Sequence, residues 1–176
     1  MKNALKSYKG TDVHWGRSQA QIVGMLNSRG IEDVQFTNIS HDTAAKNGLE
    51  MREGTVAIVL VFQKQEVMPD GVSGNIPVRI VIPNVNTDGR ALNQYYRVLY
   101  WYLKSKFEAI DTGLVEFAEE FMPHLQIAGK NGGIRRLWDT FRGNYYKSIS
   151  SGEQGNSNLL PPMGGTERPD DESNDS

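Results

Sequence analysis

Cysteine is absent from this chain of 176 residues, so it contains neither a disulfide nor a zinc site built on thiolates. Long apolar runs are absent too. The longest one, residues 56–62, is too short to cross a bilayer, and the first fifteen residues hold no apolar run of signal-peptide length. We therefore expect a soluble cytoplasmic protein without a membrane partner.

Sequence motifs of the common enzyme classes are also missing. The chain has no GxSxG, no GxxxxGK[ST] and no GxGxxG, which mark serine hydrolases, P-loop nucleotidases and dinucleotide-binding enzymes. The three histidines, His14, His41 and His124, do not stand at metal-ligand spacing. These absences predict a protein without enzymatic activity, cofactor or metal.

A metal-dependent nuclease is the enzymatic alternative that stays open. Asp70 could share a hard cation with Glu53 or Glu66, because carboxylate oxygens are the ligands that such a cation prefers. The preceding strand has Phe62 two residues before Lys64, where a carboxylate would complete the site. We therefore rank this alternative below a binding function.

Charge is distributed unevenly along the chain. Residues 1–149 carry 18 Lys and Arg against 15 Asp and Glu, whereas residues 150–176 carry one Arg against six acids. The last segment is dominated by Gly, Ser, Asn and Pro and is too poor in apolar residues to offset its ordering entropy. This pattern predicts one binding domain, residues 1–149, followed by a disordered acidic tail.

The hydrophobic periodicity predicts an α+β domain with a small, mostly antiparallel sheet packed against a long helix and two shorter helices. Strands are expected at residues 34–37, 55–63 and 76–83. Residues 38–53 are expected to form a loop or a loose turn of helix, and residues 64–75 a loop. Helices are expected at residues 17–29, from Thr87 or Asp88 to about residue 112, and from residue 114 to Pro123.

The long helix has two stripes at helical spacing. One stripe is apolar and is expected to pack on the sheet; it comprises Leu92, Tyr95, Tyr96, Leu99, Tyr102, Leu103, Phe107 and Ile110. The other stripe alternates cations with rings and comprises Arg97, Tyr100, Trp101, Lys104 and Glu108. A helix needs only one apolar stripe to pack, so the second stripe predicts a surface that stacks on bases and pairs with phosphates.

Rings and cations alternate in two further places, residues 15–17 and 134–147. The leading hypothesis is therefore a non-enzymatic protein that binds single-stranded nucleic acid, DNA ahead of RNA, largely without sequence preference. The expected binding residues are Trp15, Arg17, Arg79, Arg97, Tyr100, Trp101, Lys104, Arg135, Arg136 and Trp138. The acidic tail would compete with the nucleic acid or recruit replication or recombination proteins.

Several of these residues support a resemblance to known proteins. The pattern runs from Trp15-x-x-Ser18 through Gly30 to Arg97-x-Leu99-Tyr100-Trp101-x-x-Lys104, and the following helix carries Phe117 and Phe121. It resembles uncharacterised phage and mobile-element proteins and, more loosely, the ThermoDBP-type single-stranded-DNA-binding proteins. The resemblance implies a small antiparallel sheet backed by helices, an aromatic cleft edged by basic residues and, for a viral chain, the host cytoplasm.

A protein-interaction module is the alternative from a different class. In that case Tyr100 and Trp101 would pack against the carboxyl-terminal segment, a partner or a second copy, and Arg97 and Lys104 would be solvated flanks. The chain would then be a homo-oligomer or an accessory subunit of a phage assembly.

Overall fold

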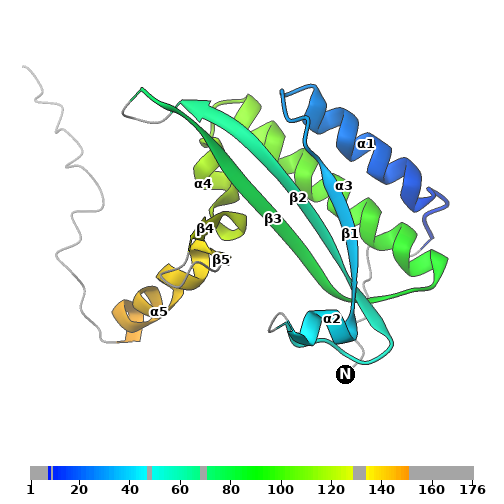
Figure 1. Cartoon of the computed structure of the whole chain (residues 1–176). Coiled ribbons are helices and arrows are strands. Elements are labelled where there is room, and N and C mark those ends of the chain that lie inside the picture. The colour runs from blue at the N-terminus through cyan, green and yellow to red at the C-terminus, as the bar shows by residue number, and fades with distance from the viewer. Residues whose placement is uncertain (1–7, 9, 47–48, 68–70, 129–133, 151–176) are drawn as a thin grey trace, which may run out of the picture. The chain divides into compact units, whose positions relative to one another are not determined.

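The computed structural model describes residues 8, 10–46, 49–67, 71–128 and 134–150 (Figure 1). The chain divides into two compact units, Met1–Thr140 and Phe141–Ser176, so the division falls inside the last helix, before the predicted end of the domain at residue 149. Of the second unit, the structure describes residues 141–150, which are helical. The predicted disordered tail from residue 151 onward lies outside the described residues.

The described part of the chain mixes helices and strands along its length. In order they are α1 (Trp15–Asn27), β1 (Gln35–Ser40), α2 (His41–Lys46), β2 (Thr55–Val67), β3 (Ser73–Asn86), α3 (Gly89–Asp111), α4 (Phe117–Phe121), the 3-10 helix η1 (Met122–His124), β4 (Gln126–Ala128), β5 (Ile134–Arg136) and α5 (Leu137–Ser150).

The first three strands form one antiparallel sheet with the order β1–β2–β3. Val59 of the central strand lies opposite Thr37 on one side and Val81 on the other. Residues 57–60 of β2 are buried, as expected for a central strand covered on both faces. The predicted α+β class with a small antiparallel sheet is confirmed.

The β2–β3 hairpin is longer than the sequence predicted. The pairing continues from Gln63, opposite Pro77, to Val67, opposite Ser73, so the expected loop at residues 64–75 is wrong for most of its length. Residues 63–66 are all polar, so they lack the alternation of apolar and polar residues that predicts a strand. In the structure Lys64 forms an ion pair with Glu66, and its ammonium lies 4.7 Å from the centre of the Phe117 ring.

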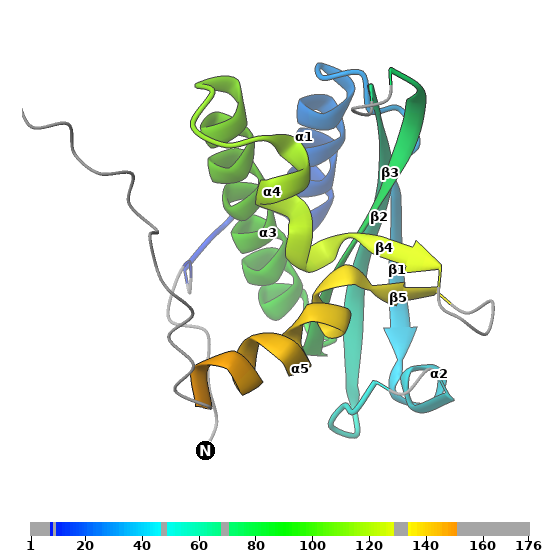
Figure 2. The ribbon, with the colours of Figure 1, turned by 90° about the vertical axis from the view of Figure 1, so that its left-hand side faces the viewer.

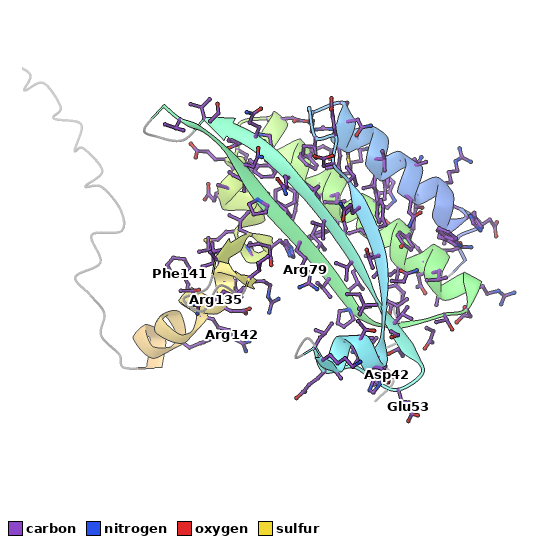
Figure 3. All side chains as sticks on the ribbon, in the orientation of Figure 1. Asp42, Glu53, Arg79, Arg135, Phe141 and Arg142 are labelled. Atoms are coloured by element: carbon purple, nitrogen blue, oxygen red, sulfur yellow. The ribbon has the colours of Figure 1, made fainter. Side chains whose placement is uncertain are left out.

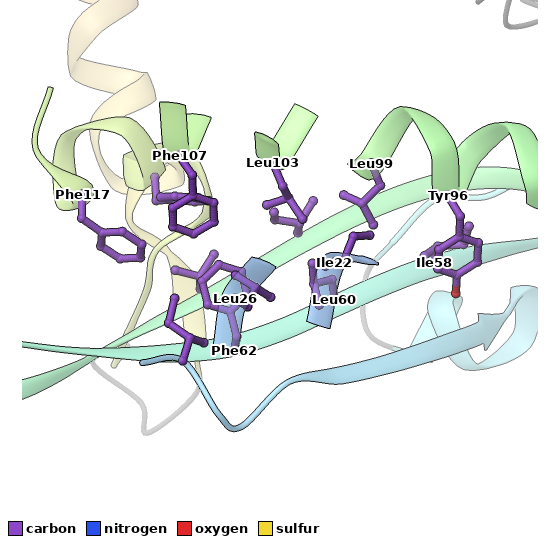
Figure 4. Packing of buried hydrophobic residues seen from close by; sticks show 14 of the residues in the cluster. Ile22, Leu26, Ile58, Leu60, Phe62, Tyr96, Leu99, Leu103, Phe107 and Phe117 are labelled. Carbon is purple, nitrogen blue, oxygen red and sulfur yellow. The ribbon is translucent and has the colours of Figure 1, made fainter. Parts of the chain in front are cut away.

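One face of the sheet carries the helices α1 and α3, and α2 lies on the other side (Figure 2). The core between the sheet and the two long helices contains aliphatic side chains and rings from every layer (Figure 4). Its largest fully buried members include Ile22, Leu26, Ile58, Leu60, Phe62, Val78, Tyr96, Leu99, Leu103, Phe107 and Phe121. None of the helices in the described part of the chain has both the length and the apolar content to cross a bilayer.

The apolar stripe of α3 is rotated relative to the prediction. Tyr96, Leu99, Leu103 and Phe107 are buried as expected, but Tyr102 is 37% exposed, so its place in the core was wrong. On a helical wheel of about 100° per residue, Tyr102 lies roughly 105° from the centre of the buried stripe, whereas Tyr100 lies only roughly 55° from it on the other side. Packing of α1 beside α3 explains the rotation, because it adds buried contact on the Tyr100 side.

The segment after α4 adds a second, two-stranded sheet. Ile127 of β4 lies opposite Arg135 of β5, and a bridge between Leu125 and Val78 connects this hairpin to the edge of β3. The sequence did not predict these strands, which are three residues each and below the length at which alternation is visible. The hairpin matters for function because it brings Arg135 and Arg136 to the main sheet.

Candidate nucleic-acid interface

The predicted binding residues lie on two separate surfaces rather than one. Val78 and Ile80 face the helices, so Arg79 between them points to the opposite face of the sheet. Trp101 lies on α3 away from the sheet, because Leu99 and Leu103 on the other side of the helix are buried. The first surface contains Arg97, Tyr100, Trp101 and Lys104, and the second contains Arg79, Arg135 and Arg136.

The remaining three predicted residues belong to neither group. Trp15 is half-buried against the core, where its ring lies 6.0 Å from the ring of Tyr96, and its backbone N–H donates to the Asn93 Oδ1 at 2.7 Å. Trp15 therefore connects the start of α1 to α3. Arg17 is exposed on the first turn of α1, and Trp138 is half-buried at the start of α5.

The four residues Arg97, Tyr100, Trp101 and Lys104 form what we call the ring-and-cation surface. The ring of Tyr100 meets the ring of Trp101 edge-on at 5.3 Å. The Arg97 guanidinium lies 4.8 Å from the centre of Tyr100 and 5.2 Å from that of Trp101, and the Lys104 ammonium lies 4.9 Å from Trp101. Trp101 is 38% exposed, whereas Tyr100 is half-buried against the core. The predicted cluster is thus assembled, with one ring in solvent and one at the border of the core.

A groove of about 350 Å³ lies next to this surface, between α1 and α3. Its lining residues are Gln21, Met25, Arg29, Tyr100, Lys104 and Glu108. Met25 and Tyr100 offer apolar contact, and the Gln21 Oε1 accepts a hydrogen bond of 2.8 Å from Arg97 Nη1. The α1 residues of this groove were not predicted, because only the packing of the two helices brings them to α3.

Acidic partners neutralise part of the positive charge of this groove. Lys104 lies 3.4 Å from the Glu108 carboxylate, and Arg29 forms an ion pair with Asp111. Arg97 instead has a neutral partner, Gln21, so its charge is not compensated there. Ion pairs at solvent-exposed positions are weak, about 0–1 kcal/mol, and therefore exchange readily for another anion.

The second surface surrounds a groove of about 270 Å³ on the outer face of the sheet, which we call the arginine groove. Its lining residues are Ile39, Ala44, Leu49, Arg79, Val81, Gln126, Ile134, Arg135, Arg136 and Asp139. The prediction included its three arginines. It missed Gln126 and the apolar residues, which come from strands, the helix α2 and a loop that are far apart in the sequence.

His124 adds no charge at neutral pH. Burial, together with the positive charges of Lys106 and Arg136, lowers its pKa to about 4. Its Nε2 lies 2.6 Å from the hydroxyl of Tyr102, so the neutral imidazole is held by a hydrogen bond. The positive charge near the β4–β5 hairpin therefore comes from Lys106 of α3 and from the arginines of β5, Arg135 and Arg136.

The enzymatic alternative is not addressed by the described residues. They contain no group of three His, Asp or Glu side chains that could hold a metal ion. Asp70, on which the nuclease hypothesis depends, lies outside them. His41 and Asp42 form an exposed pair at 3.1 Å.

Comparison with protein-family models, curated proteins and solved structures gave no match for this chain.

Proposed function

We propose that this protein binds single-stranded nucleic acid, DNA in the first instance, at the ring-and-cation surface and the adjoining groove. The observation that carries the proposal is the exposed ring of Trp101 with the cations of Arg97 and Lys104 beside it. An exposed ring offers a stacking surface to any base, and neighbouring cations pair with the phosphates on either side. Such contacts discriminate little between sequences, because every base has an aromatic face.

The two cations would act differently on the strand. Arg97 is held in place by Gln21, so the guanidinium is pre-organised, and its remaining N–H groups can donate to a phosphate. Lys104 has a side chain that is 38% exposed, and a phosphate would replace Glu108 as its partner. In this arrangement Trp101 stacks on a base, and the half-buried Tyr100 and Met25 contact a neighbouring base in the groove.

Replacement of Trp101 by alanine tests the proposal. We expect the affinity for a labelled oligothymidine to fall roughly 5- to 150-fold at low salt, because stacking contributes about 1–3 kcal/mol per base. Leu114→Ala is the matched control, since Leu114 is a 77% exposed apolar residue outside this surface, and it should bind like the unchanged protein. The proposal is wrong if the unchanged protein does not bind at low salt, or if Trp101→Ala binds equally well.

A protein-docking surface is the second candidate function. It is favoured by the exposure of Tyr102 next to Trp101, which leaves two large rings in solvent on one helix. Light scattering separates the two candidates. An oligomer that dissociates on Trp101→Ala, together with no binding of oligothymidine, would favour docking.

A further inference from the structure

The arginine groove lies on the face of the sheet opposite α1 and α3, and it is independent of the ring-and-cation surface. Figure 2 shows α2 on this side of the sheet, with the β4–β5 hairpin extending across the edge of β3 to the same side. Figure 3 shows Arg79 on β3 and Arg135 on β5 near the place where the hairpin meets the strand. The groove thus combines residues from the sheet, the α2 region and the hairpin.

Its three arginines differ in their partners. Arg136 donates from Nε and Nη2 to the two carboxylate oxygens of Asp139, each at 3.0 Å. The side chains of Arg79 and Arg135 make no hydrogen bond or ion pair with any residue in the described part of the chain. Arg79 is also half-buried, and a partly buried charge without a partner is unfavourable unless an anion compensates it.

Gln126 provides an independent sign of a ligand. The side chain lines the same groove, and its Nε2 is shielded from solvent without an acceptor among the described residues. A buried donor without an acceptor costs about 1–3 kcal/mol, and a ligand oxygen in the groove would remove that cost.

The rest of the lining is apolar. Ile39 and Val81 belong to the sheet, and Ile134, which is 77% exposed, stands at the start of β5. A bare inorganic anion would leave these side chains without a partner. A ligand that carries an organic part beside its anionic group would use both halves of the groove.

The charge balance selects the kind of anion. Three arginines against Asp139 leave two positive charges, whereas a phosphate monoester carries about −1.5 to −2 at pH 7 and a phosphodiester only one negative charge. We propose that the arginine groove binds a phosphate monoester. Its phosphate lies between Arg79 and Arg135, and its organic part lies over Ile39 and Val81. A free nucleotide and the phosphorylated end of a nucleic-acid strand both carry this group.

Calorimetric titration with adenosine 5′-monophosphate tests this proposal. We expect one molecule to bind per chain, more tightly than inorganic phosphate and much more tightly than adenosine. Arg79→Gln and Arg135→Gln should each weaken binding at least roughly tenfold, since each removes a charge-assisted hydrogen bond. Arg90→Gln is the matched control, because Arg90 is an exposed arginine outside the groove, and it should bind normally.

The pH dependence distinguishes a monoester site from a general polyanion site. Binding should weaken as the pH falls below about 6, because the phosphate then loses one of its two charges. A second titration, with oligothymidine carrying or lacking a 5′-phosphate, separates the sources. For each source the gain in affinity from the phosphate is measured: phosphorylated against unphosphorylated oligothymidine, and adenosine 5′-monophosphate against adenosine. A larger gain for the oligonucleotide identifies a strand end as the source, and otherwise a free nucleotide is the source.

Two outcomes would overturn the proposal. One is that the mononucleotide does not bind and the 5′-phosphate does not raise the affinity for the oligonucleotide. The other is that both arginine variants, shown to be folded by circular dichroism, bind as well as the unchanged protein. The Trp101→Ala variant should keep its affinity for the mononucleotide, so failure of one site is distinguishable from failure of the other.

Discussion

At the scale of single residues, Ser18 is an unusual member of the core. It is 0% exposed, and its hydroxyl has no hydrogen-bond partner among the described residues. A buried hydroxyl without a partner is unfavourable, whereas an apolar group of similar size in its place is neutral or stabilising. We expect Ser18→Ala to raise the free energy of unfolding by roughly 0–1 kcal/mol in urea titrations. Ser28→Ala, at an exposed position, is the control, and a clear loss of stability in Ser18→Ala alone would contradict the expectation.

His124 makes stability depend on pH. The pKa of His124 is near 4 in the folded protein and 6.5 in the unfolded chain. Between these two pH values the unfolded chain binds a proton that the folded chain does not. Its contribution to stability is therefore complete above pH 6.5 and decreases as the pH falls towards 4. We expect His124→Gln to lose less stability than the unchanged protein between pH 7 and pH 4 in urea titrations. Parallel pH profiles for the two proteins would show that His124 is not responsible.

On α3, the sequence predicted the burial of some side chains but not of others. Helical spacing correctly placed Leu99 and Leu103 in the core, but it left the exposure of Trp101 open, and the structure shows that residue to be 38% exposed. It wrongly placed Tyr102 in the core and Tyr100 on the opposite stripe, because both residues lie at the border of the apolar stripe. The choice between them depends on which side of α3 is covered by α1, and this is a property of tertiary packing rather than of the helix itself.

At the scale of elements, the start of α3 depends on a single side chain. The sequence allowed Thr87 or Asp88 as the N-cap, and in the structure the Asp88 carboxylate accepts a hydrogen bond of 2.8 Å from the Ala91 N–H. We expect Asp88→Ala to lower the free energy of unfolding by about 1 kcal/mol, the usual cost of removing an N-cap. Thr87→Ala should change it by less than about 0.5 kcal/mol, as for an ordinary surface position. Equal effects of the two variants in thermal denaturation would contradict this assignment.

Length alone did not make an element predictable, because α5, with 14 residues, was not predicted. The two long strands and the long helix were found because their residues repeat a pattern over several periods. For residues 38–53 the sequence left open a loop or a turn of helix, and the six-residue α2 lies there. The β4–β5 hairpin was missed, since its formation depends on contacts with the main sheet. The same limit applies to the binding residues. The sequence indicated Arg79 and Arg135 as cations, but only the hairpin brings them to one groove.

For the molecule as a whole, the charge of residues 150–176 should affect binding at a distance. This segment carries one Arg and six acids, so it repels a polyanion from the basic remainder of the chain. We expect a chain that ends at Ser150 to bind oligothymidine more tightly at low salt, with a difference that disappears as salt screens the repulsion. A full-length chain with the six acids replaced by their amides should behave like the shortened one. Equal affinities of all three proteins at low salt would refute a role for the acidic charge.

The unequal lengths of the strands have a consequence for self-association. β1 pairs only with Val56–Val61, so residues 62–67 of β2 have no described strand on that side. Unpaired peptide groups along a strand can add a strand from another chain, and repetition of this step produces aggregates. Lys64 and Glu66 lie within this stretch as an ion pair, and an incoming strand would have to desolvate both charges. The hairpin can therefore extend beyond its neighbour without becoming a template for polymerisation.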